Sequence, residues 1–192
     1  LTFSLATKYS SRVDALTSEM EKAGDFKGSA EVTETAAALI EAMARNTPEV
    51  GLESVEASTE RQTFGFKKAA TLRRRLGWLR SEKLKDNPGA LVATAIALEL
   101  VNSGLSLVKR GTEQYIALRR EEMLAEEVQG TALISSRQLV EGMEADRRGL
   151  AVADALLALK INDRQRADFQ RERSFLNQRI ASVAAALALE KP

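Results

Sequence analysis

The 192-residue chain contains no cysteine and no histidine. Without cysteine, disulfide bonds, thiolate metal sites and cysteine nucleophiles are excluded. Without histidine, the chain lacks the commonest general base, the commonest metal ligand and any catalytic triad built on imidazole. Enzymes that use only carboxylates, lysines and tyrosines exist, but catalysis is less common without histidine and cysteine. We therefore expect a non-catalytic protein that has no cofactor and no metal site.

Proline and aromatic residues are scarce, with three prolines and 5% aromatics, whereas alanine and leucine are abundant. This composition favours helix over sheet. A hydrophobic share of 44% and a charged share of 29% are typical of a folded globular protein. We predict an all-α fold: one domain over residues 1–192, forming an elongated helical bundle of about five to seven helices, with a candidate sub-boundary near 86–89.

Apolar residues at spacings of three and four predict a helix to about Lys22 and another after Ser29. Thr47 is a candidate N-cap for a third helix, and Gly65 suggests a bend. Thr112 is the next candidate N-cap.

In the second half of the chain, the pattern beyond Thr112 predicts a helix to about Glu144, with a turn at 147–149. Segment 150–190 lacks glycine and proline, which predicts a single long C-terminal helix unless Asn162 and Gln165 cap a new one.

The longest apolar run lies at 87–110, with Asn87 as the expected N-cap and Pro88 at the first helical position. Because apolar residues occur on nearly every face, this helix must be covered by protein or by lipid. Membrane insertion of 89–108 is borderline, since one central charge such as Glu99 costs about 3 kcal/mol. The residues therefore favour a buried bundle helix.

Charge is divided unevenly along the chain. Residues 13–60 contain eleven acidic and three basic residues, whereas residues 61–85 contain nine basic residues and one acidic residue. The candidate anion-binding or partner-binding residues are Lys67, Lys68, Arg73, Arg74, Arg75, Trp78 and Arg80. Such a surface is suited to phosphate backbones, with the indole available for stacking. The alternative, favoured by the total charge of only +1, is that the acidic and basic segments face each other, within one molecule or between neighbours.

Segment 181–189 is apolar almost all round, and it follows a polar helical stretch. It either docks into the core or contacts another subunit, and the surface position usual for chain termini favours the subunit. The candidate assembly contacts are Ile180, Val183, Leu187 and Leu189.

The clustered carboxylates at 121–122 and 126–127 are interpreted as a solvated acidic face. An all-oxygen Mg²⁺ or Ca²⁺ site is the lesser alternative.

These patterns together predict a structural or interaction subunit that self-associates into a larger assembly of the filament, virion or secretion-apparatus type. Its expected partners are copies of itself or other protein subunits. The alternatives are nucleic-acid binding through 67–85 and conditional membrane insertion through 89–108.

Overall fold

The computed structural model describes residues 3–46 and 55–189, which are helical in all their regular elements. The elements are α1 (Phe3–Lys22), α2 (Phe26–Arg45), α3 (Val55–Trp78), the π-helical turn η1 (Leu79–Lys83), α4 (Asn87–Leu105), α5 (Glu113–Ser135), α6 (Leu139–Leu157) and α7 (Asp163–Leu189). The predicted all-α bundle with a long C-terminal helix is confirmed.

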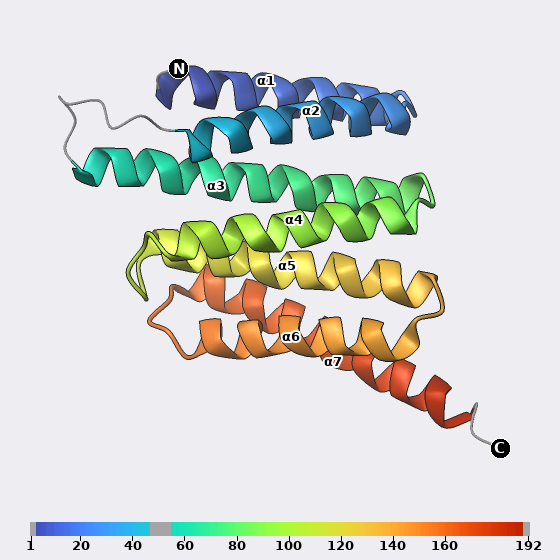
Figure 1. Cartoon of the computed structure of the whole chain (residues 1–192). Helices are drawn as coiled ribbons and strands as arrows, with labels where there is room; N and C mark the ends of the chain where they lie inside the picture. Colours follow the sequence, from blue (N-terminus) through green and yellow to red (C-terminus); the bar gives the residue numbers. More distant parts are fainter. Residues whose placement is uncertain (1–2, 47–54, 190–192) are drawn as a thin grey trace.

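The helices are stacked in chain order, as Figure 1 shows. Each packs mainly on the helix before it and the helix after it, and α3 also reaches α5. One apolar core is formed by residues of all five helices from α1 to α5 and includes Phe66, Leu100 and Leu118. A second core joins α5 to α7 and includes Met123 and Phe169. Helix α5 thus contributes to both cores and connects the two halves of the stack.

Short polar side chains set the starts of several helices. Thr112 accepts the backbone N–H of Tyr115 at 3.2 Å, as expected. The backbone N–H of Gln165 donates to the Asn162 side chain at 2.8 Å, while that of Asn162 donates to the Gln165 side chain at 3.1 Å. This reciprocal arrangement is a capping box. It starts α7 as a new helix, so the alternative of a single helix over 150–190 is wrong.

Two other predicted starts are displaced by aspartates. Helix α2 begins at Phe26 rather than after Ser29, because Asp25 accepts the N–H of Gly28 at 2.9 Å. Helix α4 is capped by Asp86 rather than Asn87, through the N–H of Gly89 at 2.9 Å. The predicted N-cap Thr47 lies outside the described residues.

The predicted turn at 147–149 is also wrong. Helix α5 ends at Ser135, and Arg137 adopts a left-handed conformation with a φ of 61°. A left-handed residue commonly terminates a helix. Gly149 instead lies inside α6, where an added Cβ would meet Leu176 at 3.3 Å and Glu126 at 3.4 Å. It therefore serves close packing. Gly65 likewise causes no break, because α3 runs through it.

Helix α4 is a bundle helix with one solvent-facing stripe. The exposed residues along this stripe are Val92, Ala95, Glu99, Asn102 and Ser106, which follow the helical period. By length and composition alone, Asn87–Leu105 is also sufficient to cross a membrane, and 39% of its apolar window is buried in the bundle. Helix α4 ends at Leu105, five residues before the predicted end.

Gly77 marks a close approach of α3 and α4. A Cβ at this position would lie 2.8 Å from Thr94 Cγ2 and 3.3 Å from the Ala90 carbonyl oxygen. We predict that Gly77→Val lowers the free energy of unfolding by about 1–3 kcal/mol, because the added atoms overpack the contact. Urea denaturation measures this loss. The control Ala95→Val, on the exposed face of α4, should cost less than about 1 kcal/mol. Equal losses for the two variants would contradict the close packing.

Candidate functional site

The basic segment of α3 and η1 faces carboxylates of other helices in the same molecule. The ion pairs are Lys68–Asp14 (2.8 Å), Arg73–Glu41 (3.3 Å), Arg74–Glu121 (2.8 Å), Arg75–Glu21 (2.6 Å) and Arg80–Glu34 (2.8 Å). Four of the acidic partners lie on α1 and α2, and Glu121 lies on α5. The structure therefore places the acidic and basic segments against each other within one chain.

These contacts restrict where an external anion can bind. A phosphate that approached Arg73, Arg74 or Arg75 would have to displace a carboxylate. Of the seven sequence candidates, Lys67 and Trp78 are outside these ion pairs. The Lys67 ammonium lies 5.9 Å from the Phe64 ring centroid, and Trp78 is 38% exposed. The anion site remains a prediction. Lys67 is the candidate cation that no carboxylate of the described residues occupies.

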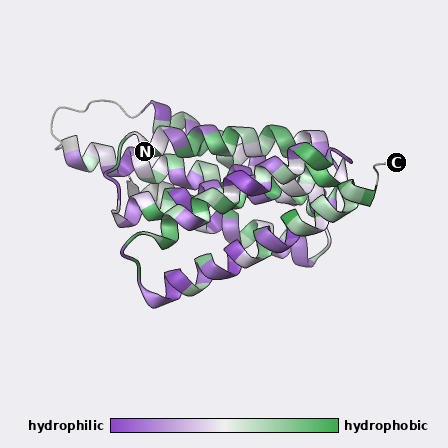
Figure 2. Cartoon of the chain, turned by 90° about the horizontal axis from the view of Figure 1, so that it is seen from below, coloured by the Kyte–Doolittle hydropathy of each residue, from purple (hydrophilic) through white to green (hydrophobic). Residues whose placement is uncertain are grey.

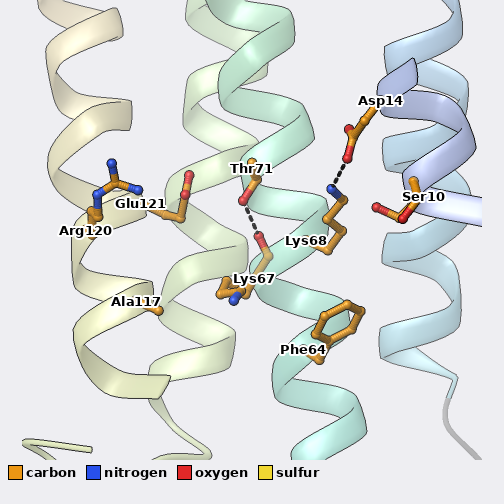
Figure 3. A pocket seen from close by; sticks show the side chains of 10 residues that line it. Ser10, Asp14, Phe64, Lys67, Lys68, Thr71, Ala117, Arg120 and Glu121 are labelled. Carbon is orange, nitrogen blue, oxygen red and sulfur yellow. Dashed lines mark hydrogen bonds and ion pairs between the residues drawn. The ribbon is translucent and has the colours of Figure 1, made fainter. Parts of the chain in front are cut away.

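A trough of about 380 Å³ lies beside Lys67, between α1, α3 and α5 (Figure 3). Its floor is one face of α3, formed by residues at helical spacings: Phe64, Lys67, Lys68 and Thr71. Ser10 of α1 lines one wall, and Ala117 and Arg120 of α5 line the other. Sequence reasoning missed Arg120 because nothing local indicates that α5 lies beside α3.

A second polar cluster holds α7 against the bundle. Asp146 of α6 is fully buried, and its carboxylate accepts two hydrogen bonds from the guanidinium of Arg179, one of them 2.6 Å long. Arg179 also donates to Thr131 Oγ1 at 2.6 Å and to the Glu127 carbonyl oxygen at 2.8 Å. Gly130 makes room for this cluster, since a Cβ there would collide with Asp146. A buried charge pair with this many hydrogen bonds fixes the rotation of α7 about its own axis.

The predicted solvated acidic face on α5 is wrong. Glu121 and Glu126 are only 8% and 6% exposed. Arg74 pairs with Glu121, and Arg148 donates to both oxygens of Glu126, at 2.9 and 2.8 Å. Within residues 3–46 and 55–189, no group of three or more possible ligands is arranged to hold a metal ion.

Glu127 is the most perturbed carboxyl group of α5. Burial, together with the nearby Glu172 carboxylate, raises its pKa to about 7, although Arg179 and Arg74 act in the opposite direction. A protonated Glu127 donates a hydrogen bond to Glu172 and so joins α5 to α7.

The last turns of α7 extend away from the other helices (Figure 1). Val183 is 7% exposed and Ile180 and Leu187 are half-buried, whereas Leu189 is 87% exposed. Other exposed residues of this end are Ala181, Ser182, Ala184, Ala185, Ala186 and Ala188. Figure 2 shows a hydrophilic start and a hydrophobic end of α7. Of the four predicted assembly contacts, Leu189 is thus the most accessible, while the alanines were not among them.

No family model, curated protein or solved structure matches this chain. The function is therefore argued from the residues described above.

The charge pair between Asp146 and Arg179 gives a prediction for stability. Asp146→Ala should lower the free energy of unfolding by roughly 3–5 kcal/mol, because it leaves Arg179 largely buried without its partner. Asp154→Ala is the matched control: Asp154 also joins α6 to α7, through Arg173 at 2.7 Å, but both side chains are about half exposed. The control should cost less than about 1 kcal/mol. Urea denaturation of both variants makes the comparison.

Glu127 gives a prediction for pH dependence. Its pKa is about 7 in the folded chain and 4.5 ordinarily, so the folded state binds its proton more tightly than the unfolded state. The stabilisation is therefore complete below pH 4.5 and is lost as the pH rises through about 7. We expect a loss of roughly 1–3 kcal/mol across this window. Glu127→Gln should remove this share of the pH dependence in urea denaturation series, and an unchanged slope would contradict the assignment.

Proposed function

We propose that this protein is a non-catalytic subunit that self-associates through the end of α7, residues 180–189. The observation that carries the proposal is the exposure of apolar side chains on a helix that is otherwise anchored in the bundle. Leu189 is 87% exposed, and Phe175, five residues before this segment, is 44% exposed. Phe175, Ala185 and Leu189 lie on one outward stripe of α7, which also carries the polar side chains of Gln178 and Ser182.

A second copy of the same chain is the occupant that fits this stripe. Segment 180–189 contains no charged residue, so two copies can meet without repulsion between like charges. Five alanines in the segment allow two helix axes to approach closely. An antiparallel pairing about a two-fold axis would place each stripe against its own equivalent, which is the geometry of most homodimers.

The size of the contact sets the expected affinity. A stable interface buries about 800 Å² on each partner, more than one face of three helical turns supplies. Phe175 on α7 and Val140, 53% exposed on the first turn of α6, would enlarge it. We expect a reversible association with a dissociation constant of about micromolar order, because buried area of this size leaves little surplus after the cost of association.

Other features of the chain are consistent with a binding role rather than catalysis. The sequence has no histidine or cysteine, and the most perturbed carboxyl group, Glu127, is engaged in attaching α7. Nucleic-acid binding through 67–85 is less favoured, because most of its arginines already have carboxylate partners.

Light scattering coupled to size-exclusion chromatography tests the proposal. We expect the mean mass of the full chain to rise from monomer towards dimer, or a larger species, across the micromolar range. Ala185→Glu should shift the chain to monomer, because it places a charge in the centre of an apolar contact.

The matched control is Ala167→Glu, which introduces the same change on the exposed, polar part of the same helix. It should leave the mass unchanged. A full chain that stays monomeric at all concentrations, or equal behaviour of the two variants, would contradict the proposal.

A further inference from the structure

We propose that the trough between α1, α3 and α5 binds a small phosphate monoester, with Lys67 and Arg120 as the groups that contact the phosphoryl oxygens. This site is separate from the end of α7 and does not depend on self-association. Figure 3 shows Lys67 on the α3 side of the trough and Arg120 on the α5 side, with Ala117 below Arg120 on the same α5 wall in this view. The short side chain of Ala117 leaves space for a ligand there.

The charges of the trough leave two cations without carboxylate partners. Its two carboxylates are already neutralised, Asp14 by Lys68 at 2.8 Å and Glu121 by Arg74 at 2.8 Å. Within the described part of the chain, neither Lys67 nor Arg120 forms an ion pair. A phosphate monoester carries a charge of about −1.5 to −2 at neutral pH. The charge of a phosphate monoester therefore balances the two positive charges of Lys67 and Arg120 better than the single negative charge of a carboxylate does.

A buried hydroxyl supplies a third, neutral contact. Ser10 on the α1 wall is only 4% exposed, and its side chain makes no hydrogen bond with the described residues. Figure 3 shows this hydroxyl turned towards the trough. A serine hydroxyl on this wall is able to donate a hydrogen bond to a phosphoryl oxygen.

The volume and the floor of the trough indicate what kind of group carries the phosphate. A volume of about 380 Å³ is at the lower end of the range for small-molecule sites. The half-buried ring of Phe64 forms part of the floor, below the Lys67 ammonium. The site thus suits a phosphate group carried by a compact ring, and its size excludes a nucleic-acid duplex from the interior.

Isothermal titration calorimetry of the full chain with phenyl phosphate tests the proposal at low salt and neutral pH. We expect saturable binding of one ligand per chain. Inorganic phosphate, which lacks the ring, and benzoate, which lacks the second charge, should each bind more weakly. Lys67→Gln and Arg120→Gln should each weaken phenyl phosphate binding about tenfold or more, because each removes a charge-assisted hydrogen bond. Ser10→Ala should weaken it less.

Two exposed cations outside the trough serve as controls, Lys27 on α2 and Arg164 on α7. Lys27→Gln and Arg164→Gln should leave binding unchanged, and circular dichroism establishes that each variant is folded. Because Lys67 and Arg120 lie on different helices, misfolding of one variant leaves the other as a test. The proposal is overturned if phenyl phosphate does not bind at millimolar concentration, or if the trough and control variants behave alike. Displacement of phenyl phosphate by duplex DNA with a steep salt dependence would also overturn it, in favour of a nucleic-acid surface.

Discussion

The pairing of the basic face of α3 with carboxylates on α1, α2 and α5 is the constraint on which the arrangement of the bundle depends. Apolar burial favours any packing that covers Leu72, Leu76 and Leu100, all of them almost fully buried. Burial alone does not decide which helix lies beside α3. The partly buried ion pairs do, because moving α1, α2 or α5 away from α3 would leave arginines of α3 without their carboxylate partners. Their main effect is therefore on specificity, since individual pairs near a surface contribute little to stability.

Helix α5 extends this use of charge to the second half of the chain. Its carboxylates are distributed over three neighbours: Glu121 pairs with α3, Glu126 with Arg148 of α6, and Glu127 contacts Glu172 of α7. One helix with both polar and apolar contacts to its neighbours thus orients the later helices relative to α3. The same placement of α5 beside α3 forms the trough. No single segment of the sequence predicts this trough, because its lining residues come from three helices.

The features that the sequence predicted have local causes, although the equally local caps Asp25 and Asp86 were missed. Thr112 and the Asn162–Gln165 pair could be recognised because a capping side chain acts within three residues. The boundary between α5 and α6 could not, because it depends on a left-handed Arg137, a residue type with no preference for that conformation. The buried carboxylates of α5 were also missed. Their partners lie 22 to 47 residues away in the chain, so an acidic cluster looks the same whether it is solvated or paired.

The sequence shows that the end of α7 is apolar, but only the structure shows which of its faces points towards the bundle. Arg179 is fixed by Asp146 and Thr131, and this contact determines which face of the following turns points inwards. Val183 points inwards and is buried, so Ala185 and Leu189 are left outside. Rotating the helix to bury them would expose Val183 and separate the two charges. A helix that is apolar all round cannot bury every face against one bundle, so only a contact from outside the bundle can cover the remaining face.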